Sequence, residues 1–388
     1  MAGASYTPIE MIEKLIAFDT TSRNSNLDLI DFVADYLDGL GVAVTRTFDD
    51  DGRKANLFAS LGQDRAGGVV LSGHTDVVPV DGQHWDSDPF AVVAKDQRLY
   101  GRGVADMKSF IAIALALMPE FIATDLKSPL HLALSYDEEV GCIGVDRMIA
   151  GIAAAGIAPE IVIVGEPTGM KVANAHKGIY SFRTEVTGFE AHSSATHLGV
   201  NAVMVAADLI GFLSRMAEEM KGRAEPDSGF DPPFTTVHVG TVEGGTALNI
   251  IPRRCRFQWE YRLMPEADSE EIIERFEAYA TSLVPAMRAV AEGAGIHSER
   301  RSQVPGLAVE NASPAERLVM ALTGDNRAIK VSYGTEAGKF QQAGASTVIC
   351  GPGHIAQAHK PNEFIDIAQI EACEAFMRRL MKRLQSPL

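Results

Sequence analysis

Residues 69–76 read Val69-Val70-Leu71-Ser72-Gly73-His74-Thr75-Asp76, an apolar run of strand length that ends in glycine, histidine and aspartate. Three further apolar runs, at 130–134, 161–164 and 347–350, are also followed by glycine, acids or histidine, and helix-like segments separate the runs. Short continuous apolar strands separated by helices are typical of a parallel sheet that is covered on both faces. The sequence therefore predicts an α/β fold with a mostly parallel sheet flanked by helices.

The middle of the chain follows a different pattern. Apolar and polar residues alternate over 182–186, 235–242 and 254–263, and helical periodicity covers 201–220 and 269–284. The order strand–helix–strand–strand–helix predicts a small antiparallel sheet with helices on one face, an α+β ferredoxin-like domain. We expect this domain to span 179–293, inserted between 1–178 and 294–388 of the α/β domain.

Length and composition are consistent with two folded domains. The 388 residues are 46% hydrophobic and 22% charged, which suits a globular protein with a sizeable core. The net charge of −16 disfavours nucleic acid and anionic membrane surfaces as partners. The four cysteines are scattered, the N-terminus has no basic region followed by an apolar stretch, and the apolar runs are short. Together these features favour a cytoplasmic protein.

Potential metal ligands follow each of the four strand-like runs. They are His74 and Asp76 after the first, Glu138 and Glu139 after the second, Glu166 after the third and the histidines of 351–359 after the last. Asp106 follows Gly101-Arg102-Gly103 and precedes an apolar helix. Ligands in open α/β sheets bind beyond the carboxyl ends of the strands, so we expect these side chains to converge.

Mixed histidine and carboxylate ligands suit zinc, and a pair of zinc ions is well served by a bridging carboxylate. A hydrolase also needs a carboxylate that takes a proton from water, so Glu138 and Glu139 would divide these two duties. Asp76 is well placed to orient His74. Taken singly, each residue also has a structural interpretation: Asp106 as a helix cap, the glutamates as a solvated face.

The motifs together resemble the acetylornithine deacetylase, succinyl-diaminopimelate desuccinylase and carboxypeptidase G-type family of di-zinc metallohydrolases. The resemblance covers nearly the whole chain. It rests on residues 74–79, 101–108, 137–141, 165–168, 191–194 and 358–363. It implies a zinc-peptidase-like catalytic domain and an inserted lid and dimerisation domain.

The resemblance also implies a role for each matching residue. His74 and Glu166 would hold one zinc ion, Glu139 and His359 the other, with Asp106 bridging two Zn²⁺ per subunit, for which Co²⁺ is a possible substitute. Glu138 would be the general base and Asp76 the residue that orients His74. His354 also follows the last strand, but the matching segment contains His359.

The inserted domain would complete the site. His192 would polarise the scissile carbonyl, and in this family that histidine often comes from the partner subunit, which implies a homodimer through the inserted domain. Arg262 resembles the arginine that grips a substrate carboxylate, and Asn249 lies in the matching segment. A surface salt bridge for Arg262 and a turn for Asn249 are the structural alternatives.

Residues 164–168, 175–178 and 334–337 are most similar to the acetylornithine-cleaving branch of the family. This implies removal of the acetyl group from N2-acetyl-L-ornithine, a small-molecule N-acyl amino acid, in arginine biosynthesis. Glu336 is a candidate partner for the cationic side chain of this substrate, or else a polar loop residue. A succinyl-diaminopimelate desuccinylase and a broader N-acyl-amino-acid deacylase or dipeptidase remain alternatives.

Two interpretations from other classes remain. Gly351-Pro352-Gly353-His354-Ile355-Ala356 follows a strand and fits the loose G-x-G-x-x-A pattern of dinucleotide-binding oxidoreductases. The pattern comes last in the chain, and no strand-end acid follows at the usual distance. A catalytically inactive scaffold with this fold would be expected to lack the base or a ligand, whereas all of these residues are present.

Overall fold

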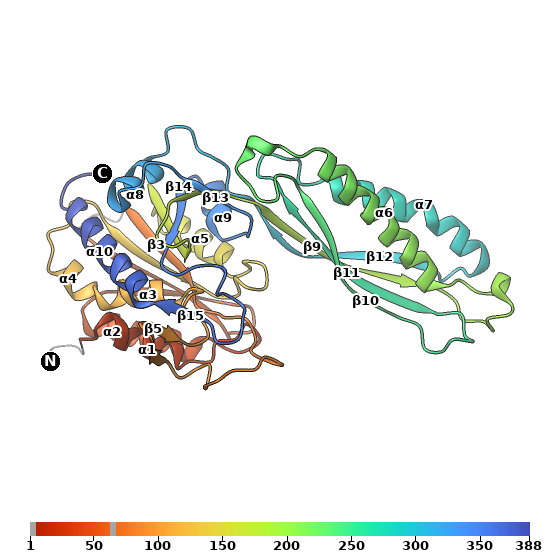
Figure 1. The fold of residues 1–388 in the computed structure, drawn as a ribbon, viewed down its shortest axis with the longest axis horizontal. Coiled ribbons are helices and arrows are strands. Elements are labelled where there is room, and N and C mark those ends of the chain that lie inside the picture. The colour runs from red at the N-terminus through yellow and green to blue at the C-terminus, as the bar shows by residue number, and fades with distance from the viewer. Residues whose placement is uncertain (1–4, 63–66) are drawn as a thin grey trace. The chain divides into compact units, whose positions relative to one another are not determined.

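The computed structural model describes residues 5–62 and 67–388, which form two compact units (Figure 1). The first contains the chain up to Ala175 together with Leu307–Lys330 and Thr335–Leu388, and the second contains His176–Gly306 and Val331–Gly334. Each unit has a hydrophobic core of its own. The second unit is thus formed by the middle of the chain, coloured green to cyan in Figure 1.

An eight-stranded sheet runs through the first unit. Its four central strands are parallel and buried on both faces, in the order β6 (Leu130–Ser135), β3 (Val69–His74), β7 (Ile161–Pro167) and β14 (Ser346–Gly351). The outer strands are β1 (Val44–Phe48) and β2 (Ala55–Leu61) on one side and β8 (Ala173–His176) and β13 (Ile329–Val331) on the other. The α/β fold and the four predicted strands are confirmed.

Helices cover both faces of this sheet. They are α1 (Pro8–Ile16), α2 (Leu27–Gly39), α3 (Lys108–Ala116), α4 (Met118–Ile122), α5 (Val145–Ala154), α8 (Pro314–Thr323), α9 (Ala337–Gln342) and α10 (Ile367–Arg383). Helix α3 is buried on all sides, as expected for a helix that is apolar all round. Gly165 and Gly73 let it approach the sheet, because a Cβ atom on Gly165 would lie 2.1 Å from the Phe110 ring.

A small three-stranded sheet joins segments that are far apart in the sequence. It pairs β15 (Phe364–Asp366) with β5 (Arg98–Tyr100), and β5 with β4 (Val93–Lys95), all antiparallel. This pairing brings the residues that precede β15 against the segment that follows β5, where the backbone N–H of Gly101 donates to the carbonyl of Glu363 at 3.0 Å.

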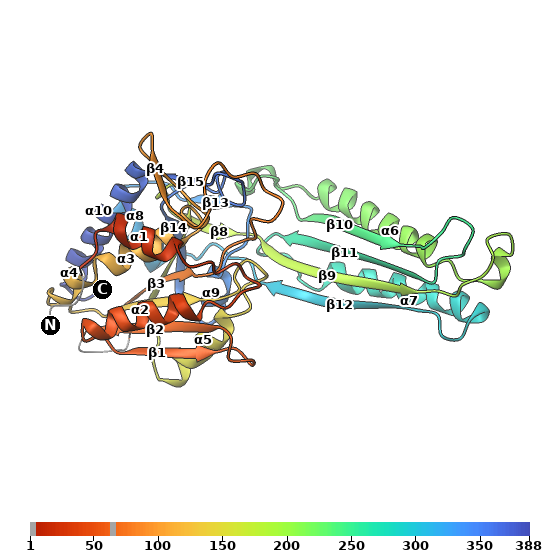
Figure 2. The ribbon, with the colours of Figure 1, turned by 90° about the horizontal axis from the view of Figure 1, so that it is seen from below.

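The second unit is a four-stranded antiparallel sheet, with two helices packed against it (Figures 1 and 2). The strand order is β10 (Thr236–Gly244), β11 (Arg254–Leu263), β9 (Gly178–Thr187) and β12 (Gly295–Val304). Helices α6 (Ala202–Gly222) and α7 (Glu271–Val290) pack on the sheet face that carries Phe182 and Trp259, and Phe276 of α7 lies against Trp259. The opposite face is polar, which is common for antiparallel sheets that are covered on one side only.

Three sequence expectations are corrected. The second unit extends to Gly306 rather than 293, because β12 pairs along the whole of β9. Helix α7 continues through Pro285 to Val290 and does not end at 284. Residues 352–363 are irregular, so no helix follows the G-x-G-x-x-A pattern to bind a pyrophosphate, and the dinucleotide-binding interpretation is wrong.

Within the described ranges, no helix combines the length and the apolar character that crossing a membrane requires.

We expect Phe276→Ala to destabilise the second unit by about 3–5 kcal/mol, because it empties a fully buried aromatic site. The Phe276 ring lies 4.6 Å from that of Trp259. Trp85 and Trp259 are the two tryptophans of the chain, so in a Trp85→Phe background the fluorescence reports unfolding around Trp259. Val290→Ala, an exposed position on the same helix, should change stability by less than about 0.5 kcal/mol. If Phe276→Ala lost as little stability as Val290→Ala, that result would contradict the packing of Phe276 in the core.

Candidate metal centre

The four central strands deliver acidic and histidine side chains to one edge of the sheet. His74 is the last residue of β3, Glu166 lies in β7, Glu138 and Glu139 follow β6, and His359 follows β14. Because β6, β3, β7 and β14 are adjacent and parallel, their carboxyl ends meet at this edge. Side-chain contacts bring these residues together in space.

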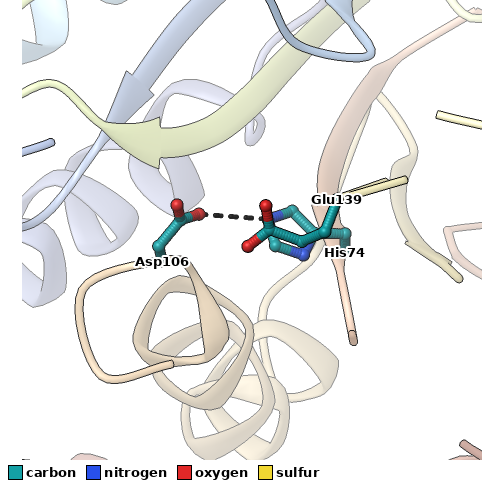
Figure 3. A group of neighbouring side chains, drawn as sticks. All are labelled: His74, Asp106 and Glu139. Atoms are coloured by element: carbon teal, nitrogen blue, oxygen red, sulfur yellow. Dashed lines mark hydrogen bonds and ion pairs between the residues drawn. The ribbon is translucent and has the colours of Figure 1, made fainter. Parts of the chain in front are cut away.

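The Asp106 carboxyl group lies between two imidazoles. Its Oδ1 is 3.1 Å from His74 Nε2, and its Oδ2 is 3.3 Å from His359 Nε2. Figure 3 shows the Asp106 carboxyl group facing the His74 ring, with Glu139 beside the ring. The residue before α3 is Met107, which caps the helix without a side-chain bond, so Asp106 is not the cap of that helix. Asp106 therefore has the geometry of a bridging ligand.

The remaining candidate ligands lie around these two imidazoles. Glu166 Oε1 is 3.6 Å from His74 Nε2, and Glu139 Oε2 is 3.0 Å from His359 Nε2. Ligand atoms of His74, Asp106 and Glu139 lie within 4.8 Å of one another, and so do those of His74, Glu138 and Glu166. Two overlapping donor sets that share one histidine would suit a pair of metal ions.

The charge of this cluster also favours a cation. In the part of the chain that is described, the ion pairs of Asp106, Glu139 and Glu166 are with the two histidines alone. Burial and the charge of Asp106 raise the pKa of Glu139 to about 7, and the same two causes raise the pKa of Glu166 well above its ordinary value. A divalent cation would keep these carboxyl groups ionised, so the residues fit a metal.

The pKa values of the two histidines are also raised. Burial disfavours a charge on His74, but hydrogen bonds with Asp106 and Asp76 raise the pKa of its imidazole well above the ordinary value. Hydrogen bonds with Asp106 and Glu139 raise the pKa of His359 to about 10. Metal ligation requires the neutral imidazole, so metal binding at this centre should release protons.

Asp76 contacts two parts of the centre, the His74 imidazole and the loop that carries Glu138 and Glu139. Its backbone carbonyl lies 2.9 Å from His74 Nδ1, whereas its carboxylate Oδ1 is 3.6 Å away. The carboxylate instead accepts the backbone N–H groups of Glu138 and Glu139, at 3.0 and 3.2 Å, and the hydroxyl of Ser22 at 2.7 Å. Asp76 thus positions the loop of both glutamates as well as the imidazole, which is more than the sequence suggested.

A carboxylate oxygen of Glu138 lies within 4.8 Å of a His74 ring nitrogen, but Glu138 forms no ion pair with either imidazole in the described part of the chain. It is half-buried, and within the same described residues its side chain makes one hydrogen bond, which the Cys142 thiol donates to Oε1 at 3.2 Å. Burial raises the pKa of Glu138 well above its ordinary value, and the charges of Glu139 and Glu336 add to this. A carboxyl group with a raised pKa beside a metal centre is suited to exchanging protons with a substrate or water.

Sequence reasoning missed Glu363, which holds the loop of Asp106. This buried carboxylate accepts the backbone N–H groups of Gly103, Ala105 and Asp106, at 3.1, 2.8 and 3.2 Å, and the guanidinium of Arg102 at 2.6 Å. The sequence feature that could have pointed to Glu363 is the Gly101-Arg102-Gly103 segment, together with an acid four residues after His359. Nothing in the sequence shows that these two segments meet through β5 and β15.

Glu336 lies beneath the sheet edge rather than in the open. It is 1% exposed, Ser135 donates a short hydrogen bond to its Oε1, and the Ser72 hydroxyl donates to Oε2 at 3.3 Å. Both carboxylate oxygens therefore have donors from the ends of β3 and β6. These contacts correct the expectation of a substrate-facing carboxylate at Glu336, because its oxygens are occupied and buried.

The second unit carries His192, Asn249 and Arg262. The N–H of Ser193 donates to the carbonyl of Asn249 at 3.1 Å, so the His192 and Asn249 segments lie side by side. The backbone N–H of Ser194 donates to Nδ1 of the exposed His192 at 3.2 Å, and the Ser194 hydroxyl lies 2.8 Å from the same nitrogen. Arg262 is near the other end of β11, where it pairs with Glu260.

Comparison with known proteins is consistent with this centre. Residues 70–383 match peptidase family M20/M25/M40. Acetylornithine deacetylase of Myxococcus xanthus is 36% identical over 381 residues, covering 95% of both chains. The acetylornithine deacetylase of Proteus mirabilis is 33% identical over 386 residues, covering 97% of this chain and 96% of the relative. An M20 family metallo-carboxypeptidase of Sulfolobus solfataricus shares the fold, with a TM-score of 0.76 at 16% identity over 98% and 99% of the two chains.

We expect Glu363→Gln to weaken metal binding about 10- to 100-fold, because the loop of Asp106 loses its charged anchor. Zinc affinity is measured by competition with a chromophoric chelator, so the result does not depend on turnover. Glu374→Gln removes a partly buried carboxylate that pairs with Arg378 on α10 and should leave the affinity unchanged. Equal zinc affinity in Glu363→Gln and the wild type would show that Asp106 is held by other contacts.

Proposed function

The chain belongs to peptidase family M20/M25/M40, and we propose that it hydrolyses N2-acetyl-L-ornithine to L-ornithine and acetate. It is a metal-dependent hydrolase that acts on a linear amide. The observation that carries the proposal is the single carboxylate, Asp106, between two imidazoles that other carboxylates flank. Full-length similarity to two acetylornithine deacetylases supports the choice of substrate and the place in arginine biosynthesis.

Two zinc ions per subunit are the proposed cofactors, with Co²⁺ as a possible substitute. His74 and Glu166 would hold one ion, and His359 and Glu139 the other, with Asp106 shared. Imidazole and carboxylate ligands in this number suit zinc. When bound, such a metal pair polarises a carbonyl group and lowers the pKa of water toward neutrality.

The protein's own residues would move the protons. Glu138 takes one proton from the attacking water and passes it to the departing amine, so that water and the amide become acetate and the free amino acid. His192 donates its Nε2–H to the carbonyl oxygen, which the hydrogen bond at Nδ1 prepares it to do. Asp76 keeps the His74 imidazole and the Glu138 backbone in place.

Arg262 is the proposed partner of the substrate carboxylate, and Asn249 the proposed partner of the substrate beside His192. A planar guanidinium suits a carboxylate because two N–H groups donate in parallel. The reaction belongs in the cytoplasm, which the four free and buried cysteines support.

We propose that the enzyme acts as a homodimer. A single copy of the second unit cannot bring His192, Asn249 and Arg262 together on one substrate molecule. His192 and Asn249 lie beyond the Arg254 end of β11, since Ile250 pairs with His192. Arg262 is about 26 Å further along β11, at about 3.3 Å per residue. An N-acetyl amino acid is much shorter than this, so two subunits would have to contribute.

An exposed edge supports the same dimer. Strand β10 is at the edge of its sheet and is largely exposed, with unpaired backbone groups along it. Large apolar side chains are also exposed here: Val242 on β10, Met204 on the neighbouring α6, and Leu248 in the loop after β10. A second copy of the chain that pairs with this edge would cover them.

We expect zinc-dependent release of amine from N2-acetyl-L-ornithine and little release from N-succinyl-diaminopimelate. The protein is first stripped with a chelator and then given up to two equivalents of zinc, and both substrates are assayed side by side. A succinyl substrate adds a second carboxylate, which needs a further cationic partner. Turnover of the succinyl compound alone would overturn the substrate while keeping the centre. Turnover of neither would shift the search to other N-acyl amino acids or dipeptides.

We expect Glu138→Gln and His192→Ala each to lose about 100-fold or more of kcat, while a 1:1 mixture recovers activity. If His192 acts in the partner's active site, a mixed dimer holds one complete site, and the exchanged mixture should reach about a quarter of wild-type activity. The control is Glu138→Gln mixed with the Glu138→Gln, His192→Ala double variant, which should stay inactive. An inactive test mixture would mean that each subunit uses its own His192.

A further inference from the structure

We propose that Glu260 is a positioning residue that aims the Arg262 guanidinium at the substrate carboxylate. This inference rests on the proposed function, which gives that carboxylate to Arg262. Glu260 would touch neither the substrate nor the metal centre. It would act by holding one edge of the guanidinium so that the other edge stays free and correctly turned.

The two side chains share one face of β11. Side chains alternate along a strand, so residues 260 and 262 point to the same side while Trp259 and Tyr261 point into the core. Arg262 Nε lies 3.0 Å from Glu260 Oε1, and Arg262 Nη2 lies 3.2 Å from Glu260 Oε2. These are two parallel charge-assisted bonds, which fix both the distance and the plane of the guanidinium.

This pairing uses only part of the donor capacity of Arg262. A guanidinium has five N–H groups, of which Glu260 takes the one on Nε and one on Nη2. Both N–H groups of Nη1 and the second one of Nη2 remain, and they lie on the adjacent edge of the same plane. That edge has the spacing that a second carboxylate needs for a bidentate contact.

The surroundings leave Glu260 as the group that orients Arg262. On the neighbouring strands, Arg262 is opposite Thr236 and Ile179, neither of which is charged. Within residues 5–62 and 67–388, the one ion pair that Arg262 forms is with Glu260. The side chains are 33% and 29% exposed, so the pair is accessible to a ligand but partly shielded from water.

Two effects of Glu260 oppose each other, and the proposal depends on which one is larger. Its charge repels an incoming carboxylate, but water screens this repulsion at a partly exposed site. Its bidentate bonds restrict a side chain that otherwise has large rotamer freedom, so that less ordering remains to be done when the substrate binds. We expect orientation to outweigh repulsion, so that neutralising Glu260 weakens substrate binding.

The test compares Glu260→Gln with the wild type on two substrates. N2-acetyl-L-ornithine carries the carboxylate, whereas N-acetyl-1,4-diaminobutane is the same molecule without it. We expect Glu260→Gln to raise KM for acetylornithine about five- to tenfold, with kcat changed less than about twofold. For the substrate without a carboxylate, kcat/KM should be the same in both proteins, a pattern that loss of stability alone would not produce.

Matched variants make the result specific. Glu299→Gln removes a carboxylate that pairs with Arg183 at 2.7 Å in the same sheet, and it should leave both substrates unaffected. Arg262→Ala should lower kcat/KM for acetylornithine more than Glu260→Gln does. The double variant should be no worse than Arg262→Ala, because Glu260 acts only through Arg262.

Each contrary result has a distinct meaning. A KM for acetylornithine that is unchanged or lower in Glu260→Gln, while Arg262→Ala raises it, overturns the inference and leaves the proposed function standing. An unchanged KM in Arg262→Ala overturns the role of both residues. If acetylornithine is not a substrate, the proposed function falls, and the same comparison on the N-acyl amino acid that is hydrolysed decides the role of Glu260.

Discussion

The Asp106 carboxyl group accepts from His74 on one oxygen and from His359 on the other, and the rest of the centre is arranged around this contact. The two histidines come from opposite halves of the chain: His74 ends β3 and His359 follows β14, and these two parallel strands lie on either side of β7. Asp106 is held differently, by a loop in which the backbone N–H groups of Gly103, Ala105 and Asp106 donate to Glu363. Burying four carboxyl groups and two imidazoles in one cluster costs free energy when no cation is present. A bound metal ion would offset this cost.

The length of β11 is the second constraint. The strand separates the His192 and Asn249 segments from Arg262 within one rigid sheet, and no side-chain motion spans that distance. Association of two subunits would therefore be part of the catalytic architecture rather than an addition to it. The exposed edge strand β10 and the apolar side chains beside it give the association a physical basis.

The sequence predicts that His74, Glu139 and Glu166 come together, because each follows a continuous apolar run, a strong local signal for a buried parallel strand. Glu363 could not be predicted, because its role depends on the pairing of β15 with β5, which brings together segments about 260 residues apart. The boundary at 293 was wrong because β12 is a polar edge strand whose alternation is weak. Glu336 was misplaced because only the structure shows that Ser72 and Ser135 point at it.

Two arginine–glutamate pairs show how burial changes what the same chemistry does. Arg102 and Glu363 are both 1% exposed, and the remaining acceptor capacity of the carboxylate goes to the backbone N–H groups of the Asp106 loop. A buried pair of this kind contributes little net stability but strongly disfavours any other loop conformation. Arg262 and Glu260 are about one third exposed, and there it is the arginine that keeps unused donors. The first pair therefore fixes the protein's own backbone, whereas the second leaves donors on one edge of the guanidinium that a substrate carboxylate would accept in the proposed role.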